Sequence, residues 1–278
     1  MAPPLAMSNH TENKKLHLRT EFLMVQLHLG DCLEVMKSIE DNSIDCIICD
    51  LPYGKTACKW DSVIPFEPLW DSYDRILKPN KVVILFGSQP FTSKLVCSNI
   101  NNFREELIWI KNKGGTGLQA KQKHIKIHEN IIVFSNSSSY TYNPMKWNVS
   151  EDFIIKRKTF TFTETNNIID SIVEHEKSKD DGTRNPISVL PYKVPYSPKR
   201  NSRTRNGDYR VHPTQKPLAL MEYLVRTYTN ENDLVLDNCM GSGTTGLACK
   251  NLGRNFIGIE KDGTYYKIAE ERLGISYH

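Results

Sequence analysis

The sequence predicts an α/β fold built on a doubly wound, mostly parallel sheet. Apolar runs of strand length alternate with amphipathic runs of helix length over residues 25–134 and again over residues 217–273. Two of the apolar runs break into polar or glycine-rich turns, which is where such sheets bind ligands. The chain has 278 residues, 39% hydrophobic and 24% charged, which is enough to bury a large core.

The first half of the pattern, residues 23–134, follows a polar and irregular segment, residues 1–22, in which we expect a flexible tail. The tripeptide Lys78-Pro79-Asn80 is expected to stop the helix before it, because proline cannot continue a helix. The run Gly-Gly-Thr-Gly at residues 114–117 marks a mobile loop. We expect strands at residues 25–30, 44–49, 81–86, 105–110 and 130–134, and helices at residues 32–39, 67–77 and 91–100.

The alternation dissolves over residues 135–210, where serine, aromatic, proline and basic residues follow one another without a regular period. This composition suits an inserted recognition region better than a core. Order returns over residues 211–278, where Pro217 suits the first position of a helix and Gly253 suits the end of another. We expect strands at residues 234–237 and 256–259, and helices at residues 217–228, through Ala248 to a cap at Gly253, and at residues 265–273.

The cysteines indicate a reduced compartment. Their number, seven, is odd, several lie in apolar runs, and no signal peptide precedes them, so we expect a cytoplasmic protein without disulfides. Cys46 and Cys49 have a zinc-like spacing, but on a strand they would point to opposite faces, and we expect core residues and no metal. No apolar run reaches the roughly 20 residues of a membrane helix.

Positive charge is concentrated near residue 200. The net charge is only +4, yet residues 193–210 contain six basic residues and one acidic residue. Such a cluster suggests a polyanionic partner, with a solvated loop as the alternative. The residues expected to contact nucleic acid are Lys199, Arg200, Arg203 and Arg205.

A glycine-rich turn follows the strand that ends at Asp237. The run from Gly241 through Gly243 and Thr244 matches the dinucleotide fingerprint, and Glu260 follows at the end of the next strand, where it can bind ribose hydroxyls. The pattern fits NAD and also S-adenosylmethionine, since both carry an adenosine, and an ordinary strand-to-helix turn is the third interpretation. Gly54-Lys55-Thr56 ends like a phosphate-binding loop, but Cys49 stands where that loop needs glycine.

The tetrad Asp50, Leu51, Pro52 and Tyr53 follows the apolar run at residues 44–49. It brings a carboxylate, a backbone carbonyl and an aromatic face to one strand end, which together suit a flat base that carries an amino group. The conjugated amine of such a base is a poor nucleophile, and two acceptors for its hydrogens would help it to react. The alternative is a structural turn with a buried tyrosine.

Three elements in this order resemble the amino-directed DNA methyltransferases of the permuted beta group: the Asp50 tetrad, the segment from His212 to Pro217, and the Gly241 turn. The resemblance covers nearly the whole chain outside residues 1–22 and 135–210. It implies a Rossmann-like class I S-adenosylmethionine-dependent methyltransferase fold, circularly permuted. Residues 23–134 would form the catalytic half, residues 135–210 a target-recognition insertion, and residues 211–278 the cofactor-binding half.

The sequence departs from the family pattern at two places. Leu51 replaces the first proline of the usual Asp-Pro-Pro-Tyr tetrad, and Asn238 and Met240 replace the usual Pro-Phe of the cofactor turn. Neither change removes a polar group that the reaction needs.

The resemblance implies a role for each candidate residue. Asp50 and the Leu51 carbonyl would accept from the target amine, and Tyr53 would stack on the base. S-adenosylmethionine would be the cofactor, without a metal. Asp31 would bind its adenine and Glu260 its ribose. Asp237 would bind the methionine part together with the turn at Gly241, Gly243 and Thr244. Thr214 and Lys216 would close over the methionine end.

The expected activity is methylation of adenine N6 in double-stranded DNA, with the base flipped out of the helix. A cytosine N4-methyltransferase is the nearest alternative, although related cytosine enzymes more often carry serine where this chain has Asp50. A DNA-binding module with a vestigial cofactor fold and a nicotinamide dehydrogenase are further alternatives. A second copy of the chain and a cognate restriction endonuclease are additional candidate partners.

Overall fold

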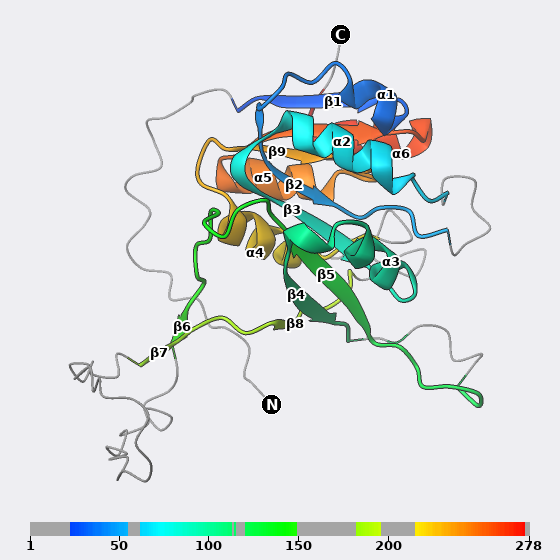
Figure 1. The fold of residues 1–278 in the computed structure, drawn as a ribbon, viewed down its shortest axis with the longest axis vertical. Coiled ribbons are helices and arrows are strands. Elements are labelled where there is room, and N and C mark those ends of the chain that lie inside the picture. The colour runs from blue at the N-terminus through cyan, green and yellow to red at the C-terminus, as the bar shows by residue number, and fades with distance from the viewer. Residues whose placement is uncertain are drawn as a thin grey trace.

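Eight strands form one sheet in the order β1-β10-β9-β2-β3-β5-β4-β8 (Figure 1). The computed structural model describes residues 23–54, 62–112, 114, 120–148, 182–195 and 215–275. The strands of this sheet are β1 (Val25–Leu29), β2 (Ile44–Cys49), β3 (Leu77–Gly87), β4 (Phe103–Ile110), β5 (His128–Phe134), β8 (Val189–Pro191), β9 (Leu234–Asp237) and β10 (Asn255–Glu260). A separate two-stranded ribbon pairs β6 (Trp147–Asn148) with β7 (Thr183–Arg184).

Five neighbouring strands of the sheet, β1, β10, β9, β2 and β3, run parallel. β5 is antiparallel to both β3 and β4, and β8 is parallel to β4. The carboxyl ends of the parallel strands therefore share one edge of the sheet with the amino end of β5. This arrangement confirms the predicted doubly wound, mostly parallel sheet.

Strands from the two ends of the chain are neighbours, as the predicted permutation requires. β1 pairs with β10 from Val25 opposite Phe256 to Leu29 opposite Glu260. β2 pairs with β9 through Cys46 opposite Val235 and Ile47 opposite Leu236. The second pairing brings the end of the strand before Asp50 beside the end of the strand before the glycine turn.

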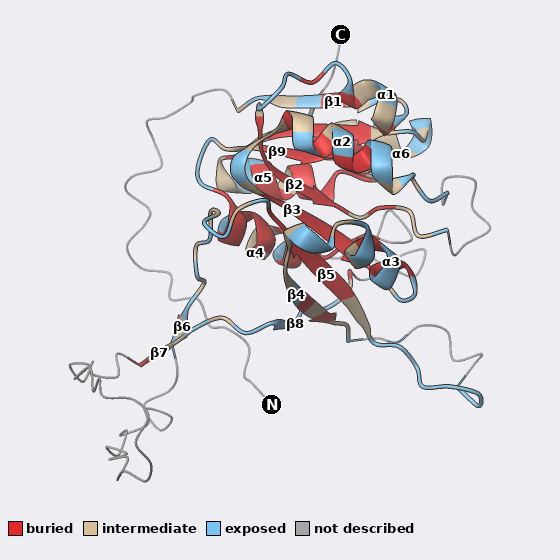
Figure 2. Cartoon of the chain, in the orientation of Figure 1, coloured by how far each residue is buried: buried red, intermediate tan, exposed pale blue. Residues whose placement is uncertain are grey.

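Helices cover both faces of the sheet, and the buried residues lie between these layers (Figure 2). One face is covered by α1 (Cys32–Met36), α2 (Phe66–Ile76) and α3 (Phe91–Ser98), and the other by α4 (Leu218–Tyr228), α5 (Thr244–Leu252) and α6 (Gly263–Leu273). Every residue of β2 is buried. Cys46 packs in one core and Cys49 in the other, as their spacing on a strand predicts.

The expected helices exist, but two end early. α1 ends at Met36 instead of residue 39, and α3 ends at Ser98, followed by a 3-10 turn at Ile100–Asn102. Part of the region expected to be inserted joins the main sheet, since β8 lies at its edge beside β4. The longest described helices have 11 residues, so none of them combines the length and apolar character of a membrane span.

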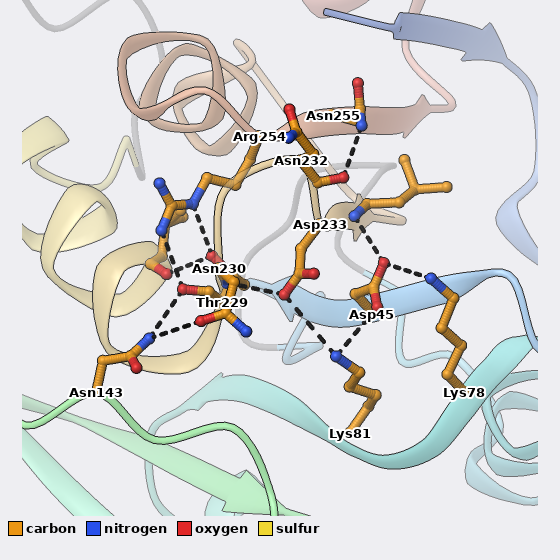
Figure 3. Close-up of polar contacts among 12 residues, drawn as sticks. Asp45, Lys78, Lys81, Asn143, Thr229, Asn230, Asn232, Asp233, Arg254 and Asn255 are labelled. Atoms are coloured by element: carbon orange, nitrogen blue, oxygen red, sulfur yellow. Dashed lines mark hydrogen bonds and ion pairs between the residues drawn. The ribbon is translucent and has the colours of Figure 1, made fainter.

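The prediction for Lys78-Pro79-Asn80 is wrong in one respect. The helix before it does end, but the chain enters β3 already at Leu77, which pairs with Ile44. This extension brings Lys78 to Asp45, whose carboxylate accepts from Lys78 Nζ at 2.7 Å and pairs with Lys81 Nζ at 3.1 Å (Figure 3). The ion pairs hold the start of β3 against β2, where the strand pairing shifts register between Ile44 and Cys46.

The same polar network fixes the edge of the sheet opposite to the carboxyl ends (Figure 3). Oδ2 of Asp45 accepts the backbone N–H of Leu234 at 2.9 Å, which ties β2 to β9. Arg254 donates to the hydroxyl and the carbonyl of Thr229, each at 3.0 Å, and Asn143 donates to the same carbonyl at 3.0 Å. The network anchors the chain that leaves β5 to the end of α4.

Candidate active site

A cavity of about 280 Å³ opens at the carboxyl edge of the parallel strands. Its walls come from the turns that follow β1, β2, β9 and β10, and from the segment just before α4. The lining includes most of the predicted site: Asp31, Asp50, Leu51, Pro52, Tyr53, Lys216, Asp237, Gly241, Thr244 and Glu260. The carboxylate tetrad and the glycine turn thus share one cavity.

The tetrad begins where β2 ends at Cys49. The phenol of Tyr53 donates to Oδ1 of Asp50 at 2.6 Å, and its ring packs on Phe91 with the centroids 4.9 Å apart. The side chain of Leu51 is buried in the core below, so the chain passes the cavity in a fixed conformation. A carboxylate and an aromatic ring therefore line the same part of the cavity.

Lys216 forms an ion pair with Asp50. Its Nζ donates to Oδ2 of Asp50 and lies 3.5 Å from Oε2 of Glu129 and 4.8 Å from the centroid of the Phe86 ring. The lysine is only 7% exposed. Sequence reasoning assigned Lys216 to the methionine end of the cofactor, and that contact stays a prediction.

The three charges change one another's pKa. Burial raises the pKa of Asp50, with Lys216 opposing and Glu129 adding to the rise. Burial also works against the charged form of Lys216, but Asp50 and Glu129 outweigh it and raise the lysine pKa. For Glu129, burial is outweighed by Lys216 and Lys111, and the pKa is lowered. The attraction between Lys216 and the two carboxylates therefore favours the charged form of all three groups.

The glycine turn follows β9 and is closed by Glu260. Gly241 and Gly243 have φ of 53° and 75°, which a residue with a Cβ adopts only at a cost. Oε2 of Glu260 accepts the N–H of Gly241 at 2.9 Å, and Oε1 accepts the N–H of Asp262 at 2.7 Å. The carboxylate is held at the cavity wall with lone pairs left for hydroxyl donors.

Asp237 is buried at the end of β9. Burial raises the pKa of Asp237 to about 7, although its carboxylate accepts from the Thr245 hydroxyl and from the N–H of Cys239 at 3.2 Å. The pKa of this carboxyl therefore lies well above its ordinary value and close to neutral pH.

Asp31 caps α1, because its Oδ1 accepts the N–H of Leu33 at 3.0 Å, and its Oδ2 pairs with Lys261 Nζ at 3.0 Å. The Lys261 contact, foremost, lowers the pKa of Asp31. The side chain of Asp31 is 45% exposed, so it lies at the cavity mouth.

The charged residues that line the cavity distinguish between S-adenosylmethionine and NAD as the cofactor. Asp31, Asp237 and Glu260 lie at the carboxyl ends of three neighbouring strands and present acceptors, which fit the amino, ammonium and hydroxyl donors of S-adenosylmethionine. The pyrophosphate of NAD would instead face these carboxylates. The N–H of Gly241, which could have bound a phosphate, already donates to Glu260. The lining fits S-adenosylmethionine.

Several predicted residues lie outside the described part of the chain, namely Thr214, Lys199, Arg200, Arg203 and Arg205. The expected tail, most of the expected glycine loop, and Lys55-Thr56 lie outside it too. Sequence reasoning missed Glu129 and its partner Lys111, whose Nζ donates to Oε1 of Glu129. The available signal was a carboxylate at the start of an apolar strand, but it indicates a site only if that strand runs antiparallel.

A family profile described as DNA methylase, covering N6- and N4-directed enzymes, matches residues 44–271. The Type II methyltransferase M1.MboII of Moraxella bovis is 28% identical over 86% of this chain and 93% of its own length. The DNA adenine methyltransferase YhdJ of Escherichia coli K12 is 29% identical over 90% of this chain and 82% of its own.

Solved structures agree with these relatives. The M1.HpyAVI–SAM complex, 27% identical, covers 90% of this chain and 100% of its own with a TM-score of 0.57. The cytosine-N4-specific PvuII DNA methyltransferase, 16% identical, covers 90% of this chain and 86% of its own with a TM-score of 0.62, and it shares the fold. Since the family profile extends over most of the 278 residues, this chain belongs to the N6/N4 DNA methylase family and is an S-adenosylmethionine-dependent DNA methyltransferase.

Proposed function

We propose that the protein transfers a methyl group from S-adenosylmethionine to N6 of an adenine flipped out of double-stranded DNA. The observation that carries the proposal is the shared cavity, in which the Asp50 tetrad faces the carboxylates that suit the cofactor. The cofactor and the target base would then lie close enough for direct transfer of the methyl group.

Each residue of the tetrad that contacts the base has a different role. Bound S-adenosylmethionine supplies an electrophilic methyl group on a sulfonium. Asp50 and the Leu51 carbonyl accept the two amine hydrogens. These hydrogen bonds move the amine nitrogen toward tetrahedral geometry, so that its lone pair is less delocalised into the ring. Tyr53 stacks on the base, a contact worth about 1 to 3 kcal/mol. The proton released from the amine is first held by hydrogen bonding at Asp50.

Adenine is favoured over cytosine on two grounds. YhdJ, which aligns with most of this chain, carries a name that states adenine. The tetrad begins with Asp50, as is usual in the adenine enzymes that this chain resembles. The cytosine-specific PvuII enzyme is a relative in fold at 16% identity.

Exposed basic residues before β5 support a DNA-binding surface in addition to the predicted cluster at Lys199, Arg200, Arg203 and Arg205. The segment leading into β5 projects from the sheet (Figure 1), and all of residues 120–127 are exposed. It carries Lys121, Lys123, His124 and Lys126 without an acidic residue. Replacing Lys121 and Lys123 with alanine should lower the slope of log K against log salt by about 2.

A nucleoside assay tests the proposal. Wild-type protein is incubated with methyl-labelled S-adenosylmethionine and plasmid DNA that lacks adenine and cytosine methylation, and the digested nucleosides are separated. Label in N6-methyldeoxyadenosine supports the proposal, and label in N4-methyldeoxycytidine overturns the adenine assignment. DNA binding without any label supports the binding module instead.

Two variants accompany this assay. Asp50→Ala should lower transfer about 100-fold or more, because it removes a group aimed at the reacting nitrogen. Asp41→Ala removes a carboxylate that is 65% exposed and lies outside the cavity, and it should retain full activity.

The finer partner assignments also belong to this proposal. The name of M1.MboII includes Type II methyltransferase, which supports a restriction endonuclease as a partner of this enzyme too. We place the enzyme in the cytoplasm with the DNA and propose a homodimer. The nuclease is tested by asking whether a nuclease that co-purifies with this enzyme cleaves unmethylated plasmid but not the methylated plasmid. The homodimer is tested by mass photometry of the free protein.

A further inference from the structure

Three charged side chains from distant parts of the chain meet beside the tetrad. Asp50 follows β2, Glu129 is the second residue of β5, and Lys216 lies just before α4. Because β5 runs antiparallel to β3, its first residues reach the edge where β2 and β3 end. The side chain of Lys216 is only 8% exposed, and its two carboxylate neighbours are 23% and 17% exposed.

Lys216 is shared unequally between the two carboxylates. Its Nζ donates to Oδ2 of Asp50, while its distance to Oε2 of Glu129 is 3.5 Å. Oε2 of Glu129 is buried and accepts no hydrogen bond from any residue that the structure describes, whereas Oε1 is occupied by Lys111. A movement of less than about 1 Å would bring Nζ to hydrogen-bonding distance of Oε2.

The ion pair makes Asp50 a weaker acceptor for a target amine as long as Lys216 stays where it is. Oδ1 of Asp50 accepts from Tyr53, and Oδ2 accepts from the ammonium, whose positive charge competes with the amine for the same oxygen. A target amine needs a carboxylate oxygen as acceptor. A buried ammonium can leave Asp50 only if a second anion receives it, because an unpaired buried charge is strongly destabilised. Glu129 is the second anion within reach of Nζ among the described residues.

We propose that Lys216 is a shared counterion that moves from Asp50 to Glu129 when the target base enters the cavity, which makes Glu129 and Lys216 positioning residues for the reaction. The inference rests on the proposed function of Asp50 as acceptor of the target amine. The movement frees Oδ2 of Asp50 and keeps a positive charge close enough to hold the carboxylate ionised. Because Nζ lies 4.8 Å from the centroid of the Phe86 ring, a movement of less than about 1 Å keeps the ammonium within the roughly 6 Å of a cation–π contact.

Removing the charge of Lys216 and removing the charge of Glu129 should shift the acid limb of the pH–rate profile in opposite directions. The groups that face Asp50 are Tyr53 and Cys49 from its own segment, Lys216 from before α4, Glu129 from β5 with Lys111 behind it, and Asp237 from β9. Lys216→Met removes the favourable charge, so the limb moves to higher pH. Glu129→Gln removes a repelling charge, so the limb moves to lower pH.

The plateau rate distinguishes the movement of Lys216 from simple electrostatics. In Glu129→Gln the carboxylate of Asp50 is ionised more readily, but the second carboxylate that would receive the Lys216 ammonium is missing. We therefore expect its plateau rate of methyl transfer to fall at least tenfold with a largely unchanged KM for S-adenosylmethionine. Lys216→Arg keeps the charge and should keep the position of the acid limb.

The experiment measures initial rates of methyl transfer to unmethylated plasmid DNA between pH 5.5 and 9 with saturating S-adenosylmethionine. The matched control is Lys261→Met, which removes an ammonium from the cofactor end of the same cavity, where Lys261 pairs with Asp31. This control should not move the acid limb. A Glu129→Gln enzyme with the wild-type plateau rate, or acid limbs that move in the same direction in both variants, would overturn the proposal.

A second measurement needs no turnover. Carboxyl ¹³C NMR of the DNA-free protein follows the titration of Asp50, whose resonance is identified by its absence in Asp50→Asn. The midpoint should rise in Lys216→Met and fall in Glu129→Gln, and unchanged midpoints would contradict the shared charge. If these midpoints move but wild type methylates no DNA, the proposed function fails while the shared counterion stands.

Discussion

The phenol of Tyr53 donates a hydrogen bond of 2.6 Å to Oδ1 of Asp50, and so joins the aromatic face and the carboxylate of the tetrad into one unit. The ring is supported from behind by Phe91, at a centroid distance of 4.9 Å. The hydroxyl and the ring can therefore be separated by substitution.

Tyr53→Ala should reduce kcat/KM for DNA by about 5- to 150-fold, which corresponds to 1 to 3 kcal/mol of lost stacking on the base. Tyr53→Phe keeps the ring and loses only the hydrogen bond to Asp50, so its loss should be clearly smaller. Steady-state kinetics on plasmid DNA measure both variants. Equal losses in the two variants would show that the hydroxyl, not the ring, carries the contribution of Tyr53.

The raised pKa of Asp237 should make cofactor binding depend on pH. If the ionised carboxylate binds the ammonium of S-adenosylmethionine, affinity is weak below the pKa of about 7 and rises with pH. The free group releases its proton on binding, so Kd should fall about tenfold between pH 5.5 and 7. Calorimetry in this range avoids titration of the cofactor amine, whose pKa is roughly 7.7 to 8.0.

Asp237→Asn serves as the control for this dependence. The amide has nearly the same shape and no charge to titrate, so the variant should bind more weakly at pH 7 and show a flat profile. An unchanged slope in the variant would assign the pH dependence to another group.

Gly243→Ala should destabilise the protein at the glycine turn. The residue has φ of 75°, and an added Cβ would lie 3.1 Å from Cβ of Ala269 in α6. The backbone conformation alone costs about 1 to 2 kcal/mol for a residue with a side chain. The contact with α6 adds to this cost, so the melting temperature should fall by more than about 4 °C.

Gly253→Ala is the matched control, because Gly253 has φ of 74° and an added Cβ there would meet no atom within 4 Å. Its melting temperature should fall by the backbone cost only. Thermal unfolding of the two variants measures the difference, and an equal fall would mean that α6 yields to the extra methyl group at no cost.

Asp45 should contribute stability that is lost in acid. Burial works to raise its pKa, but the Leu234 N–H, Lys78 and Lys81 outweigh this and leave the pKa below the ordinary value of 3.8. A lowered pKa stabilises the fold above the unfolded-state pKa, and this stability disappears as the pH falls through the folded-state value. Asp45→Asn should therefore cost roughly 3 kcal/mol at pH 7.

Urea unfolding of wild type and Asp45→Asn between pH 7 and pH 2 tests this sign. The free energies of unfolding should differ most at neutral pH and converge in acid. Asp41→Asn is the control, since Asp41 pairs with Arg75 but is 65% exposed, and surface pairs contribute about 0 to 1 kcal/mol. A constant difference at all pH values would exclude charge as the source of the effect.

Much of the site was predictable because it depends on strand ends. The apolar runs before Asp50 and Asp237 are strongly patterned, and parallel strands must bring their carboxyl ends to one edge. The glycine turn was recognisable for a similar reason, since Gly241 and Gly243 adopt a backbone conformation that glycine favours. Local sequence and chain direction suffice for both features.

The sequence by itself determined the fold class, the two motifs and the likeness to DNA methyltransferases, because periodicity and turn chemistry are local properties of the chain. Only the tertiary structure decided that Lys216 pairs with Asp50 and reaches Glu129. The contact with Glu129 depends on β5 entering the sheet antiparallel to β3, and the start of β3 is joined to β2 by ion pairs with Asp45. Contacts between buried charges are set by how strands pair over long distances, which no local pattern encodes.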